Sequence, residues 1–179
     1  VFVDSAEEPI EVLSVNVTNP IEAIQFFTKV GGRAYRPDHL EVMLLSEEVA
    51  RQGNFLADFD FVYRNPMFSS LAFLMISEDE VHKVLNTKFP AKDRIAVYLS
   101  TLIREAGKDG LTEAITLITF RQQAMDSILG KDPVIPTIRL LENGVNISGL
   151  ALFQGDKMVG QLSDIESNYY LLMTNKGKP

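Results

Sequence analysis

The sequence predicts an α+β fold, in which helices cover a mixed β-sheet and a helical segment occupies the middle of the chain. In the first half, segments with strand-like patterns alternate with segments that carry apolar residues at helical spacing. From residue 91 to about residue 129 helical spacing dominates, and strand patterns collect after residue 134. This order favours one mixed sheet with helices over it. We expect residues 1–86 together with 134–179 to form an α/β core lobe, and residues 87–133 to form a mainly helical subdomain.

Individual elements follow from periodicity and from residues that start or stop them. Alternating or continuous apolar runs predict strands: residues 9–17, 39–45, 71–76, 137–141 and a hairpin over 148–162. Apolar residues at spacings of three and four predict helices: residues 20–30, 46–52, 55–64, 81–85, 91–106, 112–129 and the segment that begins at residue 163. Residues 115–120 are rich in β-forming residues, but 120, 124 and 128 keep helical spacing, so a helix is expected there.

Several short motifs mark the ends of these elements. Ser46 with Glu47 and Glu48 predicts a helix cap. Ser77 and Ser163 each have a Glu three residues later, the order of a capping box, in which Ser and Glu satisfy free N–H groups. Gly155 and Asp156 lie between two apolar runs, as in a hairpin turn. A turn beside a helix start could also bind an anion, but each of these residues is accounted for by folding.

Composition excludes several functional classes. The chain has 179 residues, enough for one core or two small lobes, and its net charge of −7 argues against nucleic-acid binding. It contains no Cys, so disulfides and thiol nucleophiles are absent from these residues. The apolar run at 71–76 is far shorter than the roughly 20 residues that span a bilayer. The first residues lack a Met and a signal-peptide pattern, which is typical of an excised fragment.

No catalytic or cofactor site is predicted. The two histidines, His39 and His82, have no metal-ligand spacing to other residues, and we expect one to start a strand and the other to face water. Neither G-x-S-x-G nor S-x-x-K occurs, so the sequence offers no serine-hydrolase signature. A glycosidase-type pair of carboxylates is not excluded by sequence alone. The glycines at 31 and 32 lack the further glycines of a nucleotide-binding loop.

One modest basic grouping is the candidate for an interaction. It comprises Arg33, Tyr35, Arg36 and Arg51, and Arg64 joins it as a further candidate. Charge balance for nearby acidic residues is the favoured interpretation, and a binding role is the alternative.

Four motifs in order resemble one protein family. Residues 21–53 resemble its capped helix, basic turn, His-led strand and Glu-Glu-x-Ala-Arg helix start, and DFDFVYRNPMF at 58–68 resembles its acidic and apolar helix. KDPVIPTIRL at 131–140 and GLALFQGDKMVGQL at 149–162 resemble its Pro-x-x-Pro strand and its hairpin. The family is the C subunit of spore germinant receptors, the GerAC-type lipoproteins. Asn65 and Met67 stand where the family often has Asp and Glu.

The resemblance implies a non-enzymatic subunit without a cofactor, held by a lipid such as palmitate on the outer face of the spore inner membrane. It also implies assembly with membrane-embedded A and B subunits in a receptor that responds to nutrients. The lipid-bearing Cys would lie before residue 1, and the separate C-terminal domain of the family would begin after residues 178–179. The alternative is a small-ligand sensor with a cleft between the α/β part and the helical part, and an extracellular hydrolase is a third hypothesis.

Overall fold

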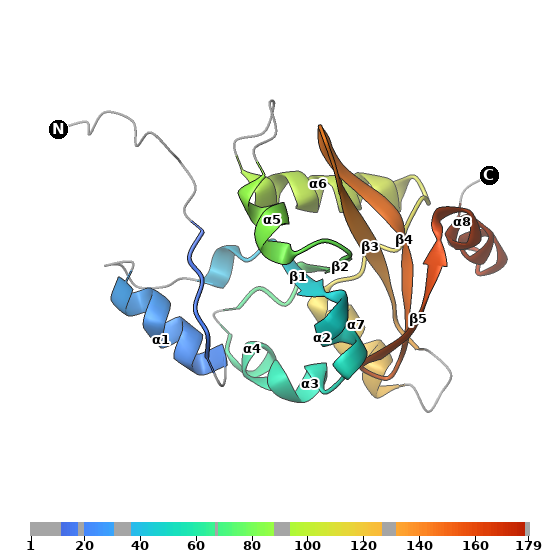
Figure 1. Ribbon diagram of the computed structural model, residues 1–179. Helices are drawn as coiled ribbons and strands as arrows, with labels where there is room; N and C mark the ends of the chain where they lie inside the picture. Colours follow the sequence, from blue (N-terminus) through green and yellow to red (C-terminus); the bar gives the residue numbers. More distant parts are fainter. Residues whose placement is uncertain are drawn as a thin grey trace.

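A five-stranded mixed sheet lies at the centre of the computed structural model, which describes residues 12–17, 20–30, 37–66, 68–87, 94–126 and 132–177 (Figure 1). The strand order is β1-β2-β3-β4-β5. The strands are β1 (Val42–Ser46), β2 (Phe73–Ser77), β3 (Val134–Leu141), β4 (Gly144–Gln154) and β5 (Lys157–Ser163). The first three strands are parallel, and β3, β4 and β5 are antiparallel. The predicted α+β class with a mixed sheet is confirmed.

Eight α-helices and one short 3-10 helix precede, connect or follow these strands within the described residues. They are α1 (Pro20–Val30), η1 (Pro37–His39), α2 (Glu47–Gln52), α3 (Phe55–Asp58), α4 (Asp60–Arg64), α5 (Val81–Asn86), α6 (Ile95–Lys108), α7 (Leu117–Met125) and α8 (Asp164–Met173). Pro20 is the first residue of α1, as its fixed φ and missing N–H predict. The residues expected to flank this helix, Asn19 and the glycines at 31 and 32, lie outside the described part.

Helices cover both faces of the sheet. Leu74 and Ile76 of β2 face one cluster, which α2, α3, α4 and α7 complete, whereas Met75 faces the opposite cluster with α5 and α6. All three side chains are 0% exposed. Because successive side chains of a strand point to opposite faces, a continuous apolar run is what a strand covered on both sides requires.

The segment predicted to form a helical subdomain contributes to both of these clusters. Leu99 and Ile103 of α6 pack with Met75 on one face, and Phe120 of α7 packs on the other face with Phe153 of β4. The ring centroids of those two phenylalanines are 5.5 Å apart. The division into a core lobe and a helical subdomain stays a prediction, but α6 and α7 share their cores with the strands.

Three strand predictions are displaced or wrong. Residues 12–17, the described part of the expected first strand, form no regular structure. The second strand begins at Val42 instead of 39, because the Pro37–His39 turn precedes it and leaves His39 exposed. The third begins at Phe73, and Leu71 lies in a turn with 71% of its surface exposed. Hydrophobicity alone did not reveal which end of the apolar run leaves the sheet.

Helix predictions differ from the structure mainly at their starts. The helix expected over 55–64 is divided at Phe59, whose φ of −105° and ψ of 11° separate α3 from α4. The helix expected from 112 begins at Leu117, with Thr116 as its N-cap. Before that cap, Ile115 accepts from Leu74 N at 3.0 Å and Leu117 N donates to Ala72 O at 3.0 Å. The β-rich residues therefore pair with β2 before the helix starts.

The two hairpins of the C-terminal half are longer than predicted. β4 begins at Gly144, not at 148, and the β3–β4 turn consists of Glu142 and Asn143, since Leu141 pairs with Gly144. The β4–β5 turn is Gly155-Asp156 as predicted, and Gly155 has a φ of +60°. Positive φ at the first central residue of a two-residue hairpin favours Gly.

Candidate interaction site

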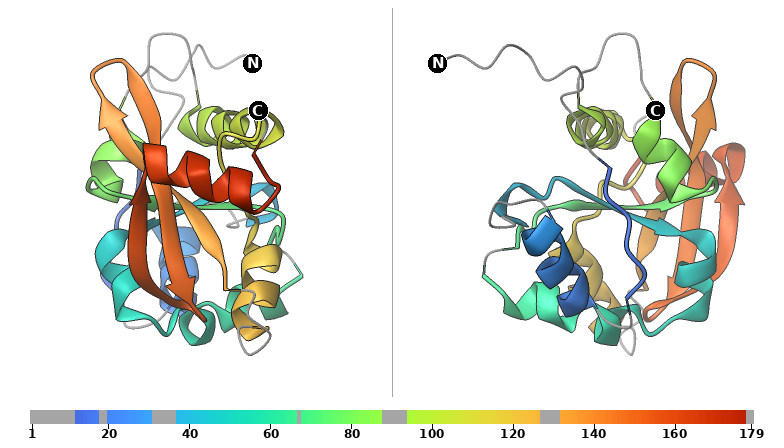
Figure 2. Two further views of the ribbon diagram at one scale, coloured as in Figure 1. Left: turned by 90° about the vertical axis from the view of Figure 1, so that its right-hand side faces the viewer. Right: turned by 60° about the vertical axis from the view of Figure 1, so that its left-hand side comes forward.

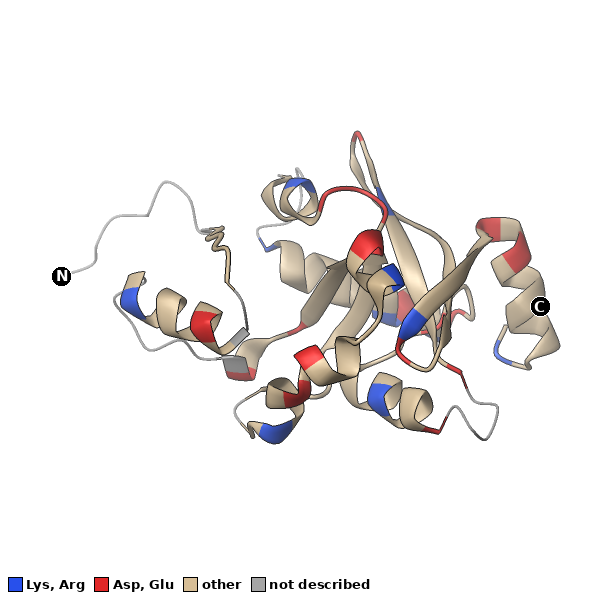
Figure 3. Cartoon of the chain, turned by 60° about the horizontal axis from the view of Figure 1, so that its bottom comes forward, with Lys and Arg blue, Asp and Glu red and all other residues tan. Residues whose placement is uncertain are grey.

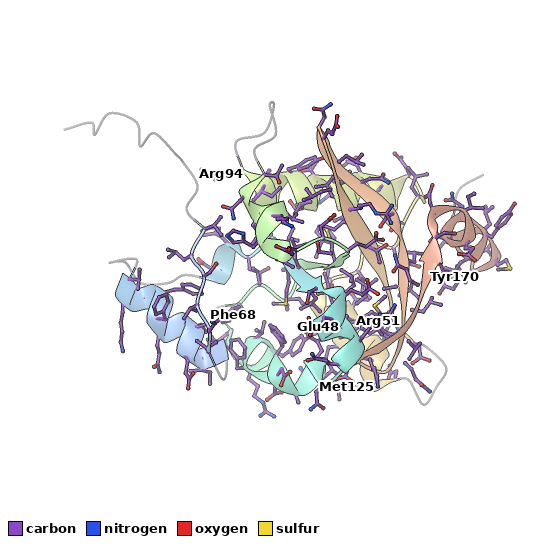
Figure 4. All side chains as sticks on the ribbon, viewed as in Figure 1. Glu48, Arg51, Phe68, Arg94, Met125 and Tyr170 are labelled. Atoms are coloured by element: carbon purple, nitrogen blue, oxygen red, sulfur yellow. The ribbon has the colours of Figure 1, made fainter. Side chains whose placement is uncertain are left out.

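The two basic candidates that the structure describes each have an acidic partner one turn earlier in their helix. The Arg51 guanidinium lies 2.7 Å from Glu47 Oε1 on α2, and Arg64 pairs with Asp60 on α4. Figure 4 shows Arg51 on α2, beside the strands. The i,i+4 spacing lets each arginine balance the charge of the acidic residue in its own helix. Exposed pairs of this kind add little stability, and the charged groups of both arginines remain at the surface. Arg33, Tyr35 and Arg36 lie outside the described residues.

The loop after β2 does not form the predicted capping box. The N-cap of α5 is Glu80, whose side chain makes no cap bond to the first N–H groups of the helix, and Ser77 Oγ instead donates to Asp79 O at 2.6 Å. Glu78 N donates to Ile138 O at 3.0 Å, and Asp79 Oδ2 accepts from Leu140 N at 2.7 Å. The acidic residues therefore extend the contact of β2 with β3 and do not serve the following helix.

Glu78 is the centre of a polar cluster that links four strands. Its Oε1 accepts from Ser148 Oγ at 2.5 Å and from Gln161 Nε2 at 2.6 Å. Its Oε2 accepts from Arg139, with Nε at 2.7 Å and Nη2 at 2.6 Å. Thr137, which is 0% exposed, bonds Ser148 through the two hydroxyls at 3.0 Å. We call Glu78, Thr137, Arg139, Ser148 and Gln161 the Glu78 cluster.

The electrostatics of the Glu78 cluster favour a carboxylate. Burial raises the pKa of Glu78, but hydrogen bonds from Ser148, Arg139 and Gln161, with the Arg139 charge, outweigh that effect and hold the pKa below its ordinary value. A general acid or base near neutral pH requires the opposite shift. Each oxygen of Glu78 already accepts at least one bond from the protein, so the cluster is suited to joining strands.

A β-bulge places Ser148 in this cluster. Thr137 pairs with Gly149 and Ile138 pairs with Ile147, so Ser148 is the extra residue in β4. A Cβ on Gly149 would lie 2.0 Å from Leu162 O, a separation that a side chain cannot occupy. Gly149 therefore permits the close approach of β4 and β5 beside the bulge.

The Gly155-Asp156 turn has a structural role that the sequence indicated only in part. Asp156 Oδ2 accepts from Leu56 N at 3.0 Å, and Gly155 N donates to Asp132 Oδ1 at 3.0 Å. Asn54, the residue before α3, makes no side-chain cap bond. Asp156 therefore caps the start of α3 from a distant part of the chain.

A second surface feature is the outer side of α8. The helix begins as predicted, with the Ser163 hydroxyl accepting from Glu166 N and the Glu166 carboxylate accepting from Ser163 N. The Ser163 hydroxyl also donates to Glu166 Oε2 at 2.7 Å, and this bond together with the one from Ser163 N holds the pKa of the exposed Glu166 carboxyl below its ordinary value. Leu171 is buried against Val134 and Leu150. On the opposite side, four large apolar residues are at least half exposed: Ile165, Tyr169, Leu172 and Met173.

The described residues contain no group of three or more His, Asp or Glu side chains arranged to hold a metal ion. Of the two histidines, His82 is exposed as expected. Among the same residues, no helix has the length and apolar character needed to cross a bilayer.

Comparison with known protein families matches almost the whole chain. Residues 2–140 match the spore germination protein N-terminal domain, and residues 148–179 match the spore germination B3/GerAC-like C-terminal domain. The chain belongs to the GerAC family of spore germination proteins. The second match begins at residue 148, inside β4, whereas the family resemblance implied a C-terminal domain that begins after residues 178–179. In the structure, residues on both sides of that boundary pair in the same β3–β4 hairpin.

Relatives agree with this family membership. The chain is 24% identical over 159 residues to the putative spore germination protein YfkR of Bacillus subtilis (strain 168), covering 82% of this chain and 38% of that protein. It is 24% identical over 139 residues to the spore germination protein GerQC of Bacillus cereus, covering 78% and 38%. The crystal structure of the GerBC protein has the same fold, with a TM-score of 0.56, 17% identity and coverage of 78% and 39%. The chain therefore spans about two fifths of its relatives.

Sequence reasoning identified the family through its motifs but missed the Glu78 cluster. Three of the cluster residues lie in the two C-terminal motifs, namely Thr137, Arg139 and Gln161. Glu78, at the centre of the cluster, lies 59 to 83 residues earlier in the chain. The signal that could have revealed the cluster was the presence of inward-facing polar residues on neighbouring strands.

Proposed function

We propose that this chain is a non-enzymatic, extracytoplasmic scaffold of a nutrient germinant receptor. The observation that carries the proposal is the ordered match to the N-terminal and C-terminal domains of the GerAC family. In this proposal the full protein is a lipid-anchored C subunit on the outer face of the spore inner membrane. It assembles there with membrane-embedded A and B subunits and is needed for the response to nutrients.

The chemistry of the described polar groups supports a scaffold. The most connected carboxylate, Glu78, is committed to Ser148, Gln161 and Arg139, and its pKa is lowered. Asp156 is committed to capping α3. These groups hold strands and helices in place, which is what an interaction module requires of its interior.

The alternative is a domain that senses a nutrient in a cleft between the sheet and the helical segment. Leu99 and Ile103 of α6, which are 1% and 0% exposed, fill the space between that helix and the sheet. This packing favours the scaffold. Thermal-shift screening with amino acids and sugars separates the two proposals, since a ligand at 100 times its dissociation constant adds about 2.7 kcal/mol of stability. Stabilisation by any nutrient would favour the sensor.

The receptor role is tested by deletion of the gene in a sporulating strain. Loss of the response to one class of germinant is expected, and unchanged germination across nutrients would refute the proposal. Point variants then locate the partner surface. Reversing the charge with Arg51→Glu or Arg64→Glu should weaken copurification with the A and B subunits.

Lys108→Glu is the matched control for these variants. Lys108 also forms an exposed ion pair within its helix, at 2.7 Å from Glu105 Oε1, so its reversal has a similar effect on helix stability. It lies on α6, on the opposite face of the sheet from α2 and α4. If the control and the two arginine variants behave alike, these arginines are not part of the partner surface.

A further inference from the structure

The helix α8 has apolar side chains on two opposite sides. Leu171 is 0% exposed and packs against β3 and β4, and Tyr170 is partly buried beside it. On the other side Ile165 is 68%, Tyr169 63%, Leu172 50% and Met173 80% exposed. Figure 2 shows α8 lying across the strands of the sheet. We call these four residues the outer face of α8.

The spacing of the outer face is that of a buried helix stripe. Its members lie at positions i, i+4, i+7 and i+8, so they form one continuous strip along the helix. A surface helix of a globular protein normally has one apolar side, and a helix that is apolar on both sides is covered on both. In the part of the chain that the structure describes, the outer face of α8 therefore has no covering layer.

The charges of α8 argue against a lipid surface as that layer. The helix carries Asp164 and Glu166 in its first turn and no Lys or Arg in its sequence DIESNYYLLM (Figure 3). Helices that lie on membranes combine an apolar side with Lys and Arg, which attract anionic headgroups. The outer face therefore suits the interior of a protein better than the surface of a membrane.

The geometry at the end of α8 keeps the chain beside this helix. Asn175 has a φ of +59°, and the N–H groups of Lys176 and Gly177 donate back to Leu171 O at 2.9 and 2.8 Å. Lys176 Nζ also lies 2.5 Å from Glu113 Oε1, in the loop before α7. A polypeptide segment connected here would have a high effective concentration at α8, which favours intramolecular docking.

We infer that the outer face of α8 is the docking surface for the rest of the C-terminal GerAC domain within the same polypeptide. The match to that domain begins at residue 148 and includes α8, and the shared stretch is only 38% of each of two relatives. The second match therefore assigns α8 to the C-terminal GerAC domain, and more than half of each of these two relatives lies outside the stretch shared with this chain. In this arrangement α8 lies between the sheet on one side and the remainder of the C-terminal domain on the other.

The test uses the full-length gene product and two cysteine variants, Leu172→Cys and Glu142→Cys. Both positions are exposed in this structure, and Glu142 lies in the β3–β4 turn, away from α8. Maleimide labelling is followed at each site by peptide mass spectrometry, so other cysteines do not interfere. We expect Leu172→Cys to react at least tenfold more slowly than Glu142→Cys in the monomeric protein, at every protein concentration and without lipid.

A second variant keeps the test decisive. Adding Tyr169→Asp and Met173→Asp to Leu172→Cys introduces charges into the docking surface and should restore the labelling rate to that of Glu142→Cys. Equal rates at both sites in the original pair would overturn the inference, because the face would then be free. Slow labelling that disappears on dilution would assign the face to a second copy, and slow labelling only with anionic vesicles would assign it to lipid. Either result overturns the proposal. None of these labelling outcomes tests whether the protein assembles into a receptor.

Discussion

Replacing Glu78 with Gln removes the charge at the centre of the Glu78 cluster while keeping its shape. The carboxylate accepts from Ser148, Gln161 and twice from Arg139, at 2.5 to 2.7 Å. A Gln side chain retains one acceptor oxygen, and its NH₂ group must face donors on the other side. Hydrogen bonds to charged groups contribute about 1.5–3 kcal/mol each, but Arg139 is 60% exposed and its share is screened by solvent. We expect a loss of about 2 kcal/mol in the free energy of unfolding.

The same substitution should change how stability depends on pH. The folded pKa of Glu78 is lowered from its model-compound value of 4.5, so its contribution is fully present above that value and is lost as the pH falls through the folded pKa. The difference between the parent protein and Glu78→Gln should therefore be constant near neutral pH. Below pH 4.5 it should shrink, because the parent protein becomes protonated at this site.

Urea unfolding at several pH values measures both effects. The control is Glu105→Gln on α6, which also removes a carboxylate but from an exposed pair with Lys108, and it should cost less than about 0.5 kcal/mol. If Glu78→Gln costs no more than this control, or if its cost grows as the pH falls, the Glu78 cluster does not hold the strands together.

Three further substitutions test the local structure. Gly149→Ala places a Cβ 2.0 Å from Leu162 O and should lower the free energy of unfolding in urea by about 3 kcal/mol or more. The control Gly160→Ala makes only ordinary contacts and should change that free energy by less than about 1 kcal/mol. Similar values for the two variants would contradict the close approach of β4 and β5. Gly155→Val forces a β-branched residue to a φ of +60° and should lower the melting temperature by an amount equivalent to about 1–2 kcal/mol, while any nutrient binding survives in the folded fraction. Loss of binding at full stability would assign the turn to a ligand. Ser163→Ala removes the N-cap of α8 and should cost about 1 kcal/mol by calorimetry, and an unchanged melting temperature would contradict the cap.

Capping signals were reliable where the acidic residues had no better partner. Ser46 and Ser163 cap α2 and α8 as predicted, because their side chains and the first N–H groups of the helix are local. Ser77-Glu78-Asp79-Glu80 also predicted a cap, but the structure does not form it. Its Glu and Asp lie at the end of a central strand, where donors from β3, β4 and β5 converge. Tertiary contacts competed successfully with a local cap.

The bulge at Ser148 shows why the polar cluster was not predicted. A change of register by one residue alters which side chains face inward, and nothing in a strand pattern marks where β3 and β4 make that change. Gly149 was visible in the sequence as a single Gly in a strand, a position that often marks a bulge or a close approach. The identity of the approaching group, the carbonyl of Leu162, depends on the pairing of β4 with β5.

The sequence by itself determined the α+β class, most helices and strands, the hairpin turn at Gly155-Asp156 and the family, because these depend on periodicity, local turn chemistry and ordered motifs. Only the tertiary structure decided that α6 and α7 cover opposite faces of one sheet, that Glu78 links four strands, and that four large apolar residues of α8 are at least half exposed. The reason is physical. Periodicity shows that a side chain prefers a protein interior, but which neighbour supplies that interior depends on residues brought together from distant parts of the chain.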